Sequence, residues 1–84
     1  MTRQQKIAQE NKKLRYLQLM VDLTAQILAQ SEGLTFLEGL DHINKVRKFA
    51  LELFPQKGPT FDLIYRPRLI RVMQERGIIN LESN

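Results

Sequence analysis

The chain has no cysteine, a single histidine and only three prolines among its 84 residues. Without cysteine it can form neither a disulfide nor a thiolate metal site, and His42 alone cannot make a His-rich metal site. We therefore expect no metal and no cofactor. A domain of this size buries only a modest share of its surface. Its stability must then come from close helix packing or from association with further subunits.

Long apolar runs are also missing. The apolar stretches are a few residues long, whereas a membrane-spanning helix needs roughly 20. The basic N-terminal segment is not followed by an apolar run, so it does not have the pattern of a secretory signal peptide. The lack of cysteine fits a reducing compartment. We expect a soluble, cytoplasmic protein that makes no membrane contact.

Catalytic signatures are absent as well. The four glycines are scattered and form no phosphate-binding loop. Ser31 and Ser83 have no histidine nearby in the sequence, which makes a nucleophile triad improbable. We expect no enzymatic activity. An enzyme would require a deep pocket lined by Arg47, Tyr65 and Arg68.

Charge is present, in three blocks of alternating sign. Residues 1–15 hold five basic residues and one acidic residue, residues 16–44 hold four acidic and no basic residues, and residues 45–84 hold eight basic and four acidic residues. The net charges of the blocks are therefore +4, −4 and +4. This alternation fits an acidic partner, and it equally fits patches of opposite sign that meet across a dimer.

Helical patterns predict one all-α domain over residues 1–84, a small bundle of three main helices. The first and longest should run from about Thr2 or Arg3 to Gln30, because no glycine or proline interrupts it. Its basic start opposes the helix dipole, and we expect residues 1–6 to be disordered. The second should begin at Thr35, whose spacing to Glu38 is that of a capping box.

The prolines and glycines mark the remaining boundaries. Pro55 should end the second helix. The third should begin near Gly58-Pro59-Thr60 and end before Gly77, a typical C-cap glycine. Pro67 lies inside it, so this helix is either kinked there or broken into two. An apolar tail follows at Ile78, Ile79 and Leu81, and we expect it to be docked.

The first helix is apolar on two sides when wound at about 100° per residue. One stripe comprises Ile7, Leu14, Leu17, Val21, Thr24, Ala25 and Leu28. The second comprises Tyr16, Leu19, Met20, Leu23 and Ile27. In so short a chain, the other two helices have little apolar surface with which to cover both stripes. The second stripe is therefore either sandwiched by the other helices or, as we prefer, the interface of a homo-oligomer.

Arginines supply a second set of candidates. Arg47 lies in the middle of the apolar stripe of the second helix, where a charge must be paired or must reach water along its stem. Asp22 and Asp62 are candidate partners, and the alternative is contact with an anion or ligand. A basic cluster follows, formed by Tyr65, Arg66, Arg68 and Arg71.

This cluster has three interpretations: a solvated surface with Arg68 in an ion pair, a nucleic-acid contact, or a contact with an acidic protein surface. We expect a non-enzymatic interaction module, a small homo-oligomer that binds or regulates a protein partner. The alternative is a nucleic-acid-binding protein that uses the basic residues near both ends of the chain.

Overall fold

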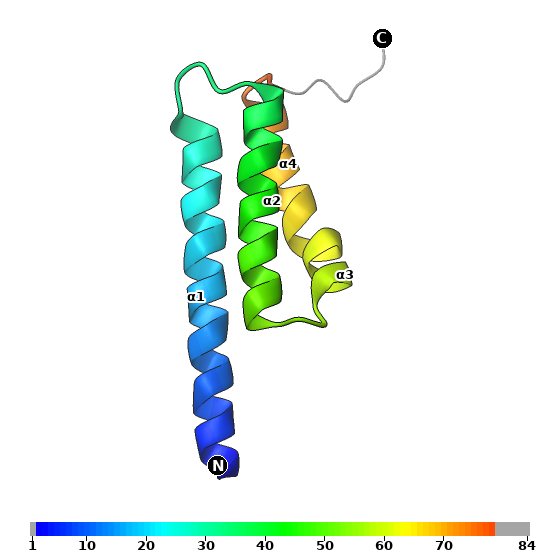
Figure 1. Cartoon of the computed structure of the whole chain (residues 1–84). Coiled ribbons are helices and arrows are strands. Elements are labelled where there is room, and N and C mark those ends of the chain that lie inside the picture. Colours follow the sequence, from blue (N-terminus) through cyan, green and yellow to red (C-terminus); the bar gives the residue numbers. More distant parts are fainter. Residues whose placement is uncertain (1, 79–84) are drawn as a thin grey trace.

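The computed structural model describes residues 2–78 and is built of helices, with no strand in that range. The elements are α1 (Arg3–Gln30), α2 (Phe36–Leu53), α3 (Gly58–Thr60), the π-helical turn η1 (Phe61–Tyr65) and α4 (Arg66–Glu75). Since α3, η1 and α4 follow one another without a break, they form one third helical segment. It packs with α1 and α2 as a three-helix bundle (Figure 1).

Local capping explains where the first two helices begin. Thr35 accepts a hydrogen bond from the Glu38 backbone N–H, and the Glu38 side chain accepts one from the Thr35 N–H, which confirms the predicted capping box. Thr2 and Gln5 form the same arrangement at the start of α1. Each box satisfies backbone donors that a helix start leaves free. The structure therefore shows a helical turn from Arg3 onward, and disorder of residues 1–6 stays a prediction.

The core occupies only part of α1. Its buried residues are Leu17, Val21, Thr24 and Leu28, whereas every residue from 2 to 16 is exposed. By length, α1 spans about 42 Å and α2 about 27 Å, so the start of α1 extends past the end of α2 (Figure 1). Ile7 and Leu14 of the first stripe are therefore exposed, at 52% and 43%, because α1 extends past the end of α2 at these positions.

Pro67 does not break the third segment: it lies in the first turn of α4, directly after the π-helical turn η1. Proline has no N–H, and its ring clashes with the carbonyl four residues earlier. The turn before it is widened instead: the Arg66 N–H donates to the Phe61 carbonyl, five residues back. Such a π-turn accommodates the ring. Ile64, which lies within this turn, is 45% exposed.

The bundle is closed at the end where α1 turns into α2. Gly39 of α2 is buried there, and a methyl group added to it would overlap the sulfur of Met73 on α4. Arg76 donates a 2.8 Å hydrogen bond to the Leu28 carbonyl in the last turn of α1. Gly77, with φ 80°, ends α4 as predicted, and the Ile78 N–H bonds back to Met73.

Ile78 packs against the core, as predicted for the start of the apolar tail, and Ile79 and Leu81 lie outside the described residues. Between residues 2 and 78, no helix combines the length and the apolar character that crossing a bilayer requires.

Candidate functional site

The second stripe of α1 is exposed in the single chain. The exposed fractions are 51% for Tyr16, 62% for Leu19 and 46% for Leu23. Met20 and Ile27, at the edge of the stripe, are half-buried. Neither α2 nor α4 therefore covers the centre of this surface. Several large apolar side chains in one row on a small protein are typical of an interaction site.

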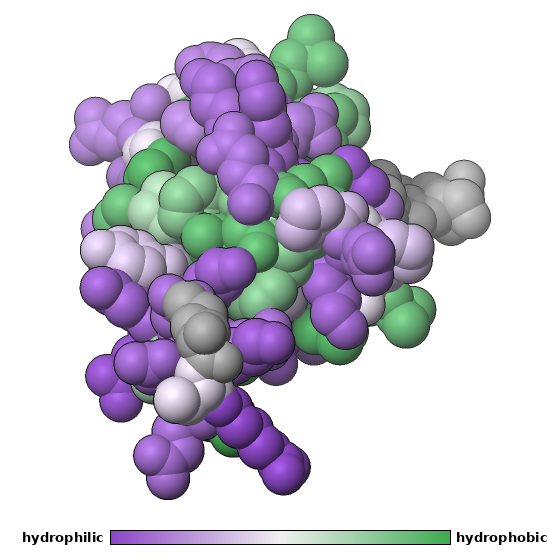
Figure 2. Space-filling model, turned by 60° about the horizontal axis from the view of Figure 1, so that its bottom comes forward, coloured by the Kyte–Doolittle hydropathy of each residue, from purple (hydrophilic) through white to green (hydrophobic). Residues whose placement is uncertain are grey.

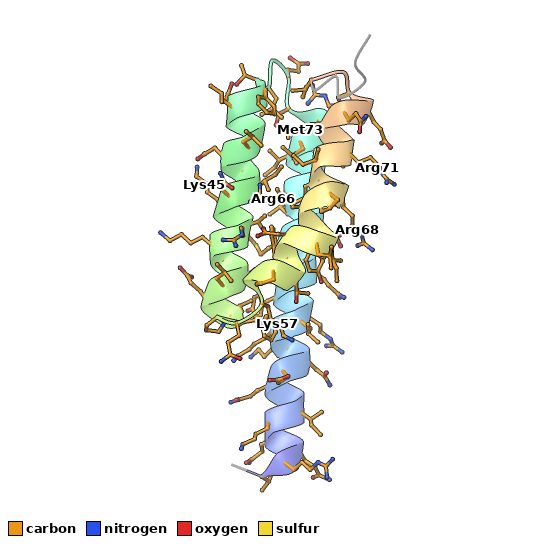
Figure 3. All side chains as sticks on the ribbon, turned by 90° about the vertical axis from the view of Figure 1, so that its right-hand side faces the viewer. Lys45, Lys57, Arg66, Arg68, Arg71 and Met73 are labelled. Atoms are coloured by element: carbon orange, nitrogen blue, oxygen red, sulfur yellow. The ribbon has the colours of Figure 1, made fainter. Side chains whose placement is uncertain are left out.

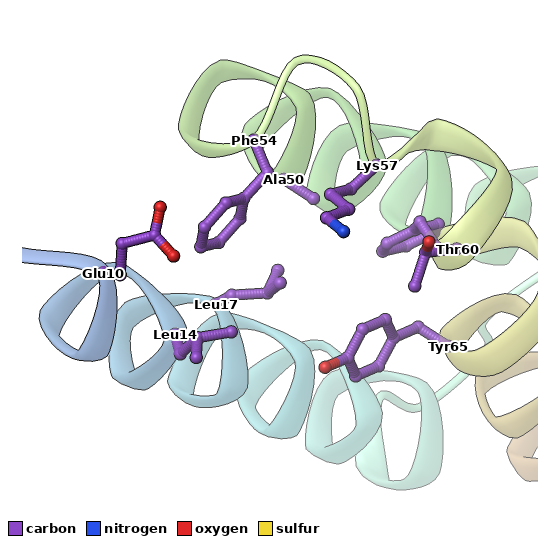
Figure 4. Close-up of a pocket in the computed structure, with 9 residues that line it drawn as sticks. Glu10, Leu14, Leu17, Ala50, Phe54, Lys57, Thr60 and Tyr65 are labelled. Carbon is purple, nitrogen blue, oxygen red and sulfur yellow. The ribbon is translucent and has the colours of Figure 1, made fainter. Parts of the chain in front are cut away.

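A cavity of about 370 Å³ lies elsewhere on the bundle, at the step where α1 extends past α2. The apolar lining is formed by Leu14 and Leu17 of α1, Ala50 of α2, Phe54 directly after α2, and Phe61 and Tyr65 of η1. Figure 4 shows the Tyr65 ring pointing from η1 toward α1, and Lys57 pointing into the opening. Viewed from this end of the molecule, hydrophobic side chains gather at the centre of the surface inside a hydrophilic rim (Figure 2).

The rim of the cavity carries charges of both signs. Glu10 and Lys57 line it together with Thr60. The ammonium of Lys13 lies 6.0 Å from the centre of the Phe54 ring, within reach of a cation–π attraction. The arrangement suits a side chain or small ligand that places an apolar part in the cavity and a polar end at the rim.

Arg47 is ion-paired, as one of the two interpretations predicted, and its partner is Asp62. Its Nε and Nη2 atoms donate to the two oxygens of the Asp62 carboxylate at 2.8 and 3.0 Å. Arg66 joins from the next turn: its Nε donates to Asp62 at 3.3 Å and its Nη2 donates to Asn44 at 3.1 Å. This network ties α2 to the third helical segment. A bidentate pair also fixes their relative orientation.

The network is reflected in the pKa of its carboxyl group. The hydrogen bonds from Arg47 hold the pKa of Asp62 below its ordinary value, and the bond from Arg66 acts in the same direction. Partial desolvation opposes this shift. The side chains of Arg47 and Asp62 remain 32% and 43% exposed, so water screens the pair.

The predicted basic cluster is divided in the structure. Arg66 points toward α2, whereas Arg68 and Arg71 point away along the outer side of α4 (Figure 3). Arg68 and Arg71 form no ion pair with any residue from 2 to 78, so the ion pair that we expected for Arg68 is not found. Tyr65 turns inward, with its ring 5.6 Å from that of Phe61. Tyr65 and Arg68 nevertheless line one surface pocket of about 320 Å³ together with Gln18 and Asp22, whereas Arg66 lies apart on the α2 side.

Sequence reasoning missed the cavity. Phe54, directly after α2, and Lys57, in the link that follows, were not among the candidate site residues, yet both line the opening. One signal was available in the lengths: a first helix of 28 residues beside a second of 18 must leave a step. Which side chains meet at the step depends on how the helices cross, and the sequence pattern does not specify this.

Comparisons with family models, with curated proteins and with solved structures found no match to this chain.

Proposed function

We propose that the protein is a non-enzymatic interaction module that self-associates through the second stripe of α1 and then binds a protein partner. The exposure of Leu19 and Leu23 carries this proposal. Each buried leucine side chain contributes about 1.5–3 kcal/mol when it leaves water. Burial of these two leucines from each copy, together with Tyr16 beside them, would favour association, and burial of the rest of the stripe would add to this free energy.

The test measures mass in solution at high micromolar concentration, by size-exclusion chromatography with light scattering. We expect the wild type to be oligomeric, and the double variant Leu19→Glu, Leu23→Glu to be a folded monomer. The matched control is Leu63→Glu, which adds a charge at a leucine that is 77% exposed on η1. A wild type that stays monomeric, or a control that dissociates equally, would contradict the proposal.

The partner is assigned to the cavity at the step. At about 100° per residue, Leu14 lies on the opposite side of α1 from Leu19 and Leu23. Self-association through the stripe therefore leaves the cavity open. Its apolar lining and charged rim suit an apolar side chain presented by another protein.

This second part can be tested with a photo-crosslinking residue placed at Lys57, on the rim, and at Lys45, on the far side of α2 (Figure 3). We expect a partner captured from Lys57, lost when Leu14→Glu is added, and not captured from Lys45. Equal capture from both positions, or capture that Leu14→Glu leaves unchanged, would reject the cavity as the partner site.

Binding of nucleic acid is the alternative that we expected from the charge. Arg47 and Arg66 are neutralised in part by Asp62, and Arg68 and Arg71 point away from them. No observation in residues 2–78 favours this function over the protein interaction.

A further inference from the structure

We infer that the second copy packs on α1 in the antiparallel direction, with Leu19 of each copy opposite Leu23 of the other. This inference rests on the proposed function, since it specifies the geometry of that self-association. It assigns a role to the exposed start of α1, which would lie along the partner's α1–α2 turn.

The positions on the exposed side of α1 follow the spacing of a coiled-coil seam. Starting at Gln5, steps of four and three residues alternate through the helix. They reach Gln5, Gln9, Lys12, Tyr16, Leu19, Leu23, Gln26 and Gln30, all of which are exposed. Only the middle of this seam is apolar. A partner helix must therefore cross at Leu19 and Leu23, and polar residues flank the contact on both sides.

The direction of the partner follows from charge. In a parallel pair, each residue faces its own copy, so Lys12 would meet Lys12 and the two segments 3–15, each with a net charge of +4, would lie together. In the antiparallel pair, Leu19 opposite Leu23 places Lys12 opposite Gln30. Residues 12–15 then lie beside the partner's residues 27–30, and residues 3–11 extend past the end of its α1 at the α1–α2 turn, residues 31–35, which contains Glu32 and no basic residue. Opposite charges on both sides of the seam favour this direction.

The partial charge at the C-terminal end of α1 also favours the antiparallel direction. The last turn of α1 holds no basic residue of its own, and Arg76 of the same copy donates to its Leu28 carbonyl, so this helix end keeps part of its negative partial charge. The antiparallel arrangement brings Lys12 of the other copy to that helix end. Because the two copies are related by a two-fold axis, each such contact occurs twice.

Cysteine cross-linking tests the direction directly, because the native chain has no cysteine to compete. Two variants, Lys12→Cys and Gln30→Cys, are mixed and oxidised, and the disulfide-linked species are identified by mass spectrometry. Both positions are exposed on α1, so the fold should tolerate both changes. We expect the disulfide between the two different variants to exceed the share that random collision gives. A mixture of Lys12→Cys with Lys45→Cys, on α2, supplies the random share.

A charge exchange provides the second readout. Lys12→Glu and Gln30→Lys, at positions that face each other in this register, should each weaken the dimer by about tenfold. Lys12→Glu places a carboxylate at the negative end of the partner's α1, Gln30→Lys places a second positive charge opposite Lys12, and each contact occurs twice. The double variant should restore most of the wild-type affinity at low salt.

The outcomes separate the two proposals. Preferential Lys12→Cys homodisulfides in a protein that is dimeric by mass would overturn the antiparallel geometry and leave self-association standing. A dimer whose affinity is not restored in the double charge variant would likewise overturn the antiparallel geometry and leave self-association standing. A protein that is monomeric by mass would remove the proposed self-association, and the geometry with it.

Discussion

The two ends of the bundle are built differently. At the end where α1 turns into α2, Leu28 and Met73 are completely buried, and Gly39 leaves no room for a side chain. At the other end, α1 continues alone, and a cavity opens beside Leu14 and Phe54. The buried contacts that hold the helices together gather at the closed end, whereas the cavity and the exposed apolar side chains lie at the open end and along one side of α1.

The largest expected effect comes from truncating a leucine of α1 at each end of the bundle, Leu28 at the closed end and Leu14 at the open end. Leu28 is 0% exposed and Leu14 is 43% exposed. We expect Leu28→Ala to lower the free energy of unfolding by about 2–5 kcal/mol, because it removes buried surface and leaves a cavity, and Leu14→Ala to lower it by less than about 1 kcal/mol. Urea unfolding of both variants at one protein concentration measures the difference. Similar losses from the two would mean that both ends stabilise the fold equally.

The next effect concerns the close approach of α2 and α4. Gly39→Ala would gain up to about 1 kcal/mol of helix propensity, but it overlaps Met73 in a packed site, which costs about 1–3 kcal/mol. We expect a net loss of about 1 kcal/mol, measured by thermal or urea unfolding. In a Met73→Ala background the overlap is absent, so the same change should become neutral or stabilising. If Gly39→Ala stabilised the wild type, the contact between α2 and α4 at Gly39 and Met73 would not be close enough to exclude a methyl group.

The hydrogen bond from Arg76 to α1 should contribute a comparable or smaller amount. Arg76→Ala removes a charged donor from the Leu28 carbonyl, and we expect a loss of about 1 kcal/mol. Arg71→Ala is the matched control, since Arg71 is exposed on the same helix and forms no ion pair within residues 2–78. The control should stay within about 0.5 kcal/mol of the wild type. Equal losses from both arginines would point to a general effect of charge.

The smallest effect is expected midway along the bundle, at Asp62. Its pKa in the folded protein is lower than in the unfolded chain, so the stabilisation is present at neutral pH and is lost as the pH falls through the folded pKa. The difference in unfolding free energy between wild type and Asp62→Asn should be constant above about pH 5 and shrink below about pH 4. Urea titrations across this range measure it. A difference that persists unchanged at pH 2 would show that the ion pair is not its cause.

Helix boundaries were predictable because their causes are local. The capping box at Thr35, the stop at Pro55 and the turn at Gly77 each depend on a few neighbouring residues. The pairing of Arg47 was also predictable as one of two outcomes, since a charge on an apolar stripe needs a partner. Asp62 was one of two candidates, and choosing between them required the packing of α2 against η1.

Features that depend on helix crossing were not predictable in this way. The close contact of Gly39 with Met73 joins residues from two helices, and neither residue is unusual within its own segment. The exposure of Leu14 follows from the different lengths of α1 and α2, which the stripe pattern of a single helix does not reveal. The π-turn before Pro67 was a third solution beside the kink and the break that the sequence predicted.

That π-turn makes the number of residues before α4 a structural requirement. It holds one more residue than an α-helical turn does. Each residue of α4 therefore lies on the side of the helix where the preceding residue would lie in an uninterrupted α-helix. If the turn closed as ordinary α-helix with the same number of residues, α4 would rotate by about 100° relative to Phe61. Leu69 and Met73 would leave the core, and the ring of Pro67 would meet a backbone with no room for it. The spacing between Phe61 and Leu69 therefore constrains this fold as strongly as the identity of either side chain.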